Sequence, residues 1–101
     1  MTDARAERRE RAAELCRRLA ADVAKVAPKG LGAWPPAWEI VEAPSKRFLD
    51  LLDEYVETGE RERLIPPIRE AYAAVVAAWK EAARRWARAG SDERKGVVHA
   101  A

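Results

Sequence analysis

A row of apolar residues between positions 68 and 86 constrains the fold of this chain most strongly. Its members are separated by 4, 3, 4, 3 and 4 residues, which is the spacing of a helix that packs against other helices along one narrow seam. The members of this seam are Ile68, Tyr72, Val75, Trp79, Ala82 and Trp86. Ala71, Ala74 and Ala78 form a small-residue surface beside the seam that would let another helix approach closely. The row predicts a helix over residues 66–89 within an all-α bundle.

Two pairs of prolines indicate where helices begin. The first turn of a helix leaves its N–H groups without intrahelical partners, so proline, which lacks an N–H, fits there at little cost. The pair Pro35-Pro36 therefore predicts the start of a short helix over residues 35–43. The pair Pro66-Pro67 predicts the start of the last helix.

The first 27 residues predict a long helix. Residues 3–27 contain no proline or glycine and are rich in Ala, Arg, Glu and Leu, which are strong helix formers. Pro28 and Gly30 then supply the stop. One narrow apolar seam runs along this helix through Ala12, Cys16, Leu19, Val23 and Val26.

A third principal helix is predicted in the middle of the chain. Pro44 breaks or kinks the chain after the short helix, and Ser45 is a suitable N-cap. The helix is predicted over residues 46–58, with Gly59 as its C-terminal stop. The expected architecture is thus a bundle of three principal helices and one short Pro-Pro helix, with no strand.

The core of this bundle is expected to be thin. Alanine accounts for 22 of the 101 residues, and a domain of this size buries a low fraction of its surface. Gly90 is expected to end the last helix, which leaves a single helical domain over residues 1–90 and a polar, flexible tail over residues 91–101. A thin core favours self-association or a partner that covers more apolar surface.

Composition also indicates the setting in which the chain works. No apolar run approaches the ~18 to 20 residues that span a bilayer, and residues 1–15 lack the apolar segment of a signal peptide. The single cysteine excludes an internal disulfide. We therefore expect a cytoplasmic protein without a membrane partner. Asparagine and glutamine are absent, which resembles the thermophile trend, although a GC-rich genome biases composition in the same direction.

Residues suited to catalysis or metal binding are scarce. The chain has one histidine, His99, one cysteine, Cys16, two serines and two threonines, too few to assemble a nucleophile, a base and an orienting acid with any redundancy. A zinc site would need about four Cys or His ligands. Carboxylates are densest at Asp50, Asp53, Glu54 and Glu57. No glycine-containing loop of oxygen ligands, as in a typical Ca²⁺ site, accompanies them. We expect no enzymatic activity, no cofactor and no metal site.

Charge is distributed unevenly along the chain. Residues 1–29 carry +3 (8 basic, 5 acidic), residues 30–60 carry −5 (2 basic, 7 acidic) and residues 61–101 carry +4 (9 basic, 5 acidic). The acidic middle is expected to face the basic helices within one bundle or across a dimer. In an alternative interpretation, the basic helices bind nucleic-acid phosphates. The residues for that alternative are Arg11, Arg18, Lys25, Arg84, Arg85, Arg88, Arg94 and Lys95.

The tryptophans are the candidates for partner binding. Buried tryptophans anchor protein interfaces, and the four in this chain are Trp34, Trp38, Trp79 and Trp86. A middle helix of about thirteen residues is too short to cover the whole seam of the last helix. The Trp79 to Trp86 end is therefore expected to be completed by another chain, most simply a second copy.

These observations predict a non-enzymatic helical interaction module that self-associates and docks a protein partner through an aromatic and apolar seam. The alternative is a nucleic-acid-binding accessory protein, or a small helical subunit of a nucleoprotein complex, that uses the basic first and last helices. A third interpretation is a helical pocket that holds a small apolar ligand. That pocket would be lined by Trp34, Trp38, Tyr55 and Trp79.

Overall fold

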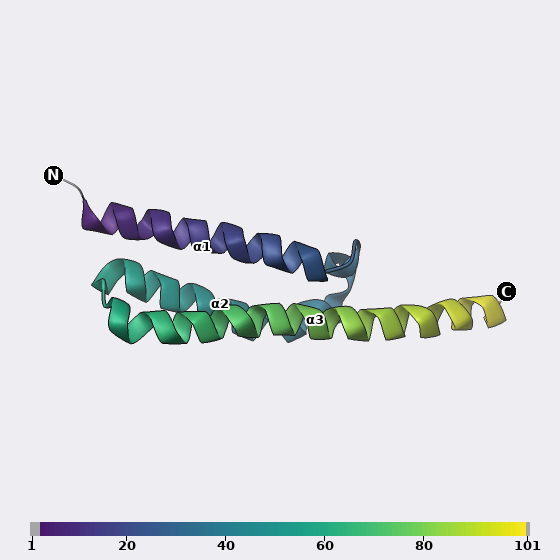
Figure 1. The fold of residues 1–101 in the computed structure, drawn as a ribbon. Coiled ribbons are helices and arrows are strands. Elements are labelled where there is room, and N and C mark those ends of the chain that lie inside the picture. Colours follow the sequence, from purple (N-terminus) through teal and green to yellow (C-terminus); the bar gives the residue numbers. More distant parts are fainter. Residues whose placement is uncertain (1–2, 101) are drawn as a thin grey trace.

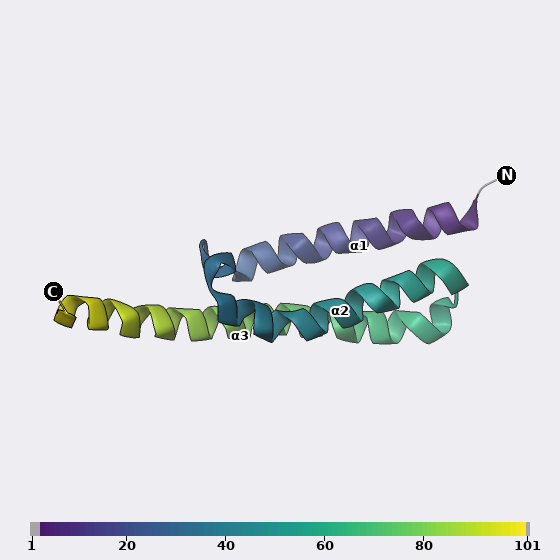
Figure 2. The same ribbon diagram turned by 180° about the vertical axis from the view of Figure 1, so that it is seen from behind.

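The protein is an elongated arrangement of three α-helices. The computed structural model describes residues 3–100, with side chains described for residues 3–90. Helices α1 (Ala4–Val26), α2 (Pro35–Thr58) and α3 (Arg61–Ala100) are joined by short connections, the first of which contains a 3-10 turn, η1 (Leu31–Ala33). α2 folds back along α3 as a close hairpin, and α1 lies along one side of this pair (Figures 1 and 2). No strand occurs among residues 3–100, so the predicted all-α class is confirmed.

α1 begins and ends within one residue of the prediction. Asp3 caps its N-terminus, with a side-chain oxygen that accepts a hydrogen bond of 3.0 Å from the Arg5 N–H. After α1 the chain turns through Pro28 and Gly30, whose φ of 93° lies in the left-handed region that favours glycine. η1 follows and brings Leu31 into the core at 1% exposure.

α2 is one helix of 24 residues where the sequence predicted two. Pro35 and Pro36 occupy its first positions as expected. The separate helices predicted over residues 35–43 and 46–58 are wrong, because α2 continues through Pro44. One buried stripe crosses that position and holds both halves of α2 against α3, which outweighs the cost of an internal proline. The stripe consists of Ala37, Val41, Phe48, Leu52, Tyr55 and Val56.

α3 is longer than predicted at both ends. Gly59 ends α2 with a φ of 70° and donates its N–H to the Tyr55 carbonyl at 2.9 Å. α3 then begins at Arg61 rather than at Pro66, so both prolines of the second pair lie inside the helix. Leu64, which precedes them, is 1% exposed and donates its N–H to the Glu60 carbonyl at 3.0 Å, so the first turn of the helix forms ahead of the prolines.

The predicted end of α3 at Gly90 is also wrong. The helix continues to Ala100, so the backbone of the expected tail is helical up to that residue. The side chains of residues 91–101 lie outside the described part of the structure. At 1.5 Å per residue, the 40 residues of α3 span about 60 Å and the 24 of α2 about 36 Å. α3 therefore projects beyond the other helices (Figure 1).

The core consists of two clusters along the α2–α3 hairpin. The larger cluster includes Phe48, Leu64, Ile68 and Val75, and the smaller one lies under η1 and the start of α2. The smaller cluster contains Leu31, Ala37, Val41 and Ala82, with Trp34, Trp79 and Trp86 packed against it. The premise that the Trp79 to Trp86 end of the seam lacks cover is therefore wrong, because the first half of α2 and η1 cover it.

α1 packs less completely than the other two helices. Leu19, at 9% exposure, is its one core residue among positions 3–26. Polar contacts hold it in place: Arg8 donates to the Val56 carbonyl at 2.8 Å, and the Tyr72 hydroxyl donates to Asp22. Because α1 rests on the hairpin along a narrow line, grooves remain on both of its sides.

Candidate docking surface

An apolar hollow lies in the groove between α1 and α2. Its volume is about 430 Å³, and it is open to solvent along one side. α1 contributes small side chains to it, including Cys16, Ala20 and Ala24, while α2 contributes Ser45, Phe48 and Leu49. Val75 and Trp79 of α3 form its floor together with Phe48. The hollow is thus walled by three helices.

Two large hydrophobic side chains of α2 are exposed near this hollow: Leu49 lines it, and Trp38 contacts Trp79, which also lines it. Trp38 is 55% exposed and Leu49 is 52% exposed, although burial of either would be favourable by about 1.5 to 3 kcal/mol. The two lie eleven residues apart on α2, which places them on one side of the helix together with Ser45. We call the surface formed by Cys16, Ala20, Ala24, Trp38, Ser45 and Leu49 the α1–α2 face.

Trp38 is held in its exposed position by two contacts. Its indole N–H donates a hydrogen bond of 3.1 Å to the Gly32 carbonyl. Its ring meets the ring of Trp79 edge to face, with centroids 6.2 Å apart, an arrangement that aromatic rings prefer. Trp38 is therefore presented to solvent in a fixed orientation, and Trp79 connects it to the hollow.

The other three predicted partner-binding tryptophans are half-buried. Trp34, Trp79 and Trp86 pack against the smaller core cluster. The Trp86 ring also lies next to the turn at Gly30, where a Cβ atom added to the glycine would be in ordinary contact with the ring at 3.8 Å. Tyr55 belongs to the larger cluster instead, so the four residues of the predicted ligand pocket are divided between two parts of the molecule.

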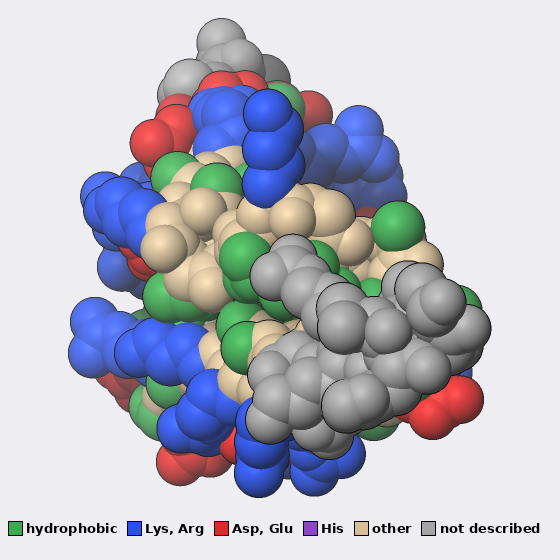
Figure 3. Space-filling model, turned by 90° about the vertical axis from the view of Figure 1, so that its right-hand side faces the viewer, with side chains coloured by type: hydrophobic (Ala, Val, Ile, Leu, Met, Phe, Trp, Pro, Cys, Tyr) green, Lys and Arg blue, Asp and Glu red, His purple; other side chains and the backbone are tan. Residues whose placement is uncertain are grey.

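Among the residues with described side chains, the predicted nucleic-acid-binding residues are divided between α1, with Arg11, Arg18 and Lys25, and α3, with Arg84, Arg85 and Arg88. Arg84 and Arg85 pair with Glu81 at 2.5 and 3.0 Å, and Lys25 lies 3.8 Å from Asp22. These arginines lower the pKa of Glu81, mainly through their hydrogen bonds to it. The side chains of Arg94 and Lys95 lie outside the described residues. Figure 3, which faces the C-terminal end of α3, shows basic side chains with acidic ones among them.

The C-terminal end of α2 provides two carboxylates that form ion pairs with arginines. Glu57 lies 2.6 Å from Arg5, and Glu54 lies 2.6 Å from Arg63. Among the described residues, no group of three or more His, Cys, Asp or Glu side chains could hold a metal ion. These two glutamates thus connect α2 to α1, through Arg5, and to the start of α3, through Arg63.

Cys16 is the one cysteine and lies in the wall of the hollow. Burial raises the pKa of its thiol, and the nearby negative charge of Asp53 raises it further. The thiol is accordingly protonated at neutral pH, as for a cysteine that packs as a small hydrophobic residue.

Comparison with protein-family models, with curated proteins and with solved structures finds no match to this chain. In addition, no helix within the described part of the chain is long and apolar enough to cross a membrane.

Sequence reasoning missed Leu49 as a surface residue. The available signal was the row Trp38, Glu42, Ser45 and Leu49, with spacings of 4, 3 and 4, which defines one side of a continuous helix. That row becomes visible only when α2 is read through Pro44.

Proposed function

We propose that this protein is a non-enzymatic interaction module that self-associates through the α1–α2 face. The observation that carries the proposal is the exposure of two large hydrophobic side chains on one side of α2, namely Leu49, which lines the apolar hollow, and Trp38, which contacts Trp79 of the same hollow. Single exposed hydrophobic residues are common, but an apolar patch of several residues is typical of an interaction surface. An exposed tryptophan fixed by neighbouring contacts is also the kind of residue that anchors such a surface.

A second copy of the chain suits this face in shape. Four of its residues are small, namely Cys16, Ala20, Ala24 and Ser45, so two helices could approach closely there. Leu49 of one copy could then fill the hollow of the other. A two-fold arrangement repeats this contact, because the same surface serves both partners.

A second copy also suits this face in charge. α1 lies in the basic part of the chain and α2 in the acidic part. A two-fold dimer that sets α1 of one copy against α2 of the other brings opposite charges together at the rim, for example Arg9 near Asp53. Such complementarity selects the orientation of the two chains.

The experiment is a measurement of molar mass by light scattering during size-exclusion chromatography. The unmodified chain is expected to have the mass of a dimer at high micromolar concentration. Leu49→Glu places a charge in the proposed interface and should yield a monomer with unchanged helicity by circular dichroism. Ala43→Glu adds the same charge to an exposed position that lines a different hollow of α2 and should leave the dimer intact. A monomeric unmodified chain, or equal effects of the two variants, would contradict the proposal.

Nucleic-acid binding has less support as the principal function. The arginines proposed for it on α3 are paired with Glu81, and such pairs reduce the charge available to phosphates. The proposal also places the module in the cytoplasm, which is supported by the single cysteine, because it leaves no internal disulfide to form in an oxidising compartment.

A further inference from the structure

A second groove runs on the other side of α1, between α1 and α3. It consists of two adjoining hollows of about 380 and 310 Å³, both lined by Leu15, Arg18 and Ile68. Because the hollows share these three residues, they form one trough along the two helices. We call this trough the α1–α3 groove.

The floor of the α1–α3 groove is apolar. Leu52 and Tyr55 of α2 lie at its base, and Ile65 and Ile68 of α3 form one wall. Tyr72 continues that wall into the second hollow. A floor of this kind favours a partner whose surface carries an apolar stripe over a partner whose surface is entirely polar.

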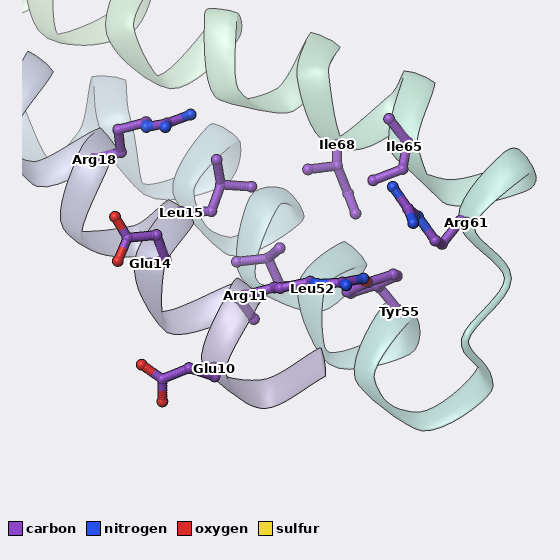
Figure 4. A pocket seen from close by; sticks show the side chains of 11 residues that line it. Glu10, Arg11, Glu14, Leu15, Arg18, Leu52, Tyr55, Arg61, Ile65 and Ile68 are labelled. Carbon is purple, nitrogen blue, oxygen red and sulfur yellow. The ribbon is translucent and has the colours of Figure 1, made fainter. Parts of the chain in front are cut away.

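Arginines line both rims of the groove. Arg11 and Arg18 stand on α1, and Arg61 and Arg69 stand on α3. All four are exposed, and none of them forms an ion pair with a carboxylate of residues 3–90. Figure 4 shows Arg11 extending beside Tyr55 and Arg61 extending towards Ile65 at the hollow.

Two carboxylates of α1 at the edge of the groove, Glu10 and Glu14, extend away from its floor (Figure 4). Glu10 and Glu14 point to the outer side of α1 (Figure 4), where both pair with Arg17 at 3.4 and 2.7 Å. The hydrogen bond from Arg17, together with its charge, lowers the pKa of Glu14. One further carboxylate, Asp22, accepts the hydrogen bond from Tyr72 at the second hollow and is paired with Lys25 at 3.8 Å. The four rim arginines therefore outnumber the carboxylates that face the groove.

We propose that the α1–α3 groove docks an acidic amphipathic helix of a partner protein. Arg11 and Arg18 are seven residues apart and Arg61 and Arg69 are eight apart, or about 10 to 12 Å along each helix. Acidic residues that flank an apolar stripe on a helix recur at the same interval of seven residues. An apolar stripe would cover the floor while carboxylates on both flanks met the two rims, a helix-in-groove arrangement.

This site is separate from the proposed self-association surface, because the α1–α2 face lies on the other side of α1. An acidic helix fits the groove better than a nucleic acid does. Phosphates could reach the arginines, but a charged backbone would leave the apolar floor in water.

The test uses a model peptide as probe. A fluorescein-labelled peptide of about three heptads would carry leucine at positions a and d, glutamate at e and g, and alanine elsewhere, so that charge repulsion keeps it monomeric. Its binding to the Leu49→Glu protein is followed by fluorescence anisotropy, which separates this test from self-association. We expect the acidic peptide to bind, and a matched peptide with lysine at e and g not to bind.

Variants of the rim arginines locate the binding site. Arg11→Glu with Arg18→Glu should weaken binding of the acidic peptide by at least about tenfold, because each change removes an attraction and adds a repulsion. Arg61→Glu with Arg69→Glu should do the same from the opposite rim, which keeps the test valid if one double variant fails to fold. Lys46→Glu with Arg47→Glu makes the same change in charge beside a different hollow of α2 and should alter affinity by less than about twofold.

Three outcomes would overturn the proposal. The first is that the acidic peptide shows no binding up to about 1 mM, where the binding free energy is only about −4 kcal/mol. The second is that the acidic and basic peptides bind equally. The third is that a single-stranded oligonucleotide binds more tightly than the peptide with the same dependence on both rims, which would assign the groove to nucleic acid.

Discussion

Replacement of Pro44 by alanine should stabilise the protein, because Pro44 lies inside α2. A proline in a helix interior costs about 3 kcal/mol relative to alanine, since it cannot donate to the carbonyl four residues earlier, that of Ile40. Pro44 is half-buried, so loss of its ring removes packing worth about 1 kcal/mol. The net expectation is an increase of about 2 kcal/mol in the free energy of unfolding.

Urea unfolding followed by circular dichroism measures this change at one fixed protein concentration, which keeps any contribution from association constant. An increase of about 2 kcal/mol should move the midpoint by about 1 to 2 M urea. Pro35→Ala is the matched control, because an N–H at the first helical position has no intrahelical partner, and it should change stability by less than about 0.5 kcal/mol. If Pro44→Ala stabilises no more than Pro35→Ala does, α2 is not one continuous helix.

Two further predictions test the packing of the connections and of α1. Leu31→Ala should lower the free energy of unfolding in urea by about 2 to 5 kcal/mol, because Leu31 is 1% exposed. Leu49→Ala, measured in the monomer, should lower it by less than about 1 kcal/mol. Similar losses in the two variants would contradict the burial of Leu31 in η1. Tyr72→Phe should cost about 1 kcal/mol at neutral pH because it removes the hydrogen bond to Asp22. Burial and that hydrogen bond raise the pKa of Tyr72, so its contribution is complete below the unfolded-state pKa of about 10 and is lost as pH rises through the higher folded-state pKa. Thermal unfolding between pH 7 and the alkaline range should therefore show a smaller loss of stability in Tyr72→Phe than in the unmodified chain, and identical losses would refute this role.

The helix starts show how far local sequence reasoning reaches. The end of α1 and the start of α2 at Pro35 follow from rules that act within a few residues, namely stop signals and the free N–H groups of a first turn. Those features were predicted correctly. The same rules were wrong at Pro44 and at Pro66, because burial against a distant helix outweighs the local cost of an internal proline. That burial depends on how α2 and α3 pair, which no short stretch of sequence specifies.

The candidate docking surface could not be predicted, because it exists only when α2 is one continuous helix. With α2 divided at Pro44, Trp38 and Leu49 belonged to separate helices and their common side could not be recognised. The predicted focus was the Trp79 to Trp86 end of α3, which α2 and η1 cover. The exposed face instead lies on α2 itself, beside a first helix that packs incompletely because most of its apolar side chains are alanine.

The most direct test of self-association through the α1–α2 face is a dilution series followed by nuclear magnetic resonance. The indole N–H signals of the four tryptophans can be resolved and assigned with single Trp→Phe variants. Because Trp38 is 55% exposed on the proposed face and Trp86 is packed beneath η1, the Trp38 signal should shift as the protein is diluted from high to low micromolar concentration while the Trp86 signal stays constant. Four signals that do not change with concentration, or a shift confined to Trp86, would contradict the account.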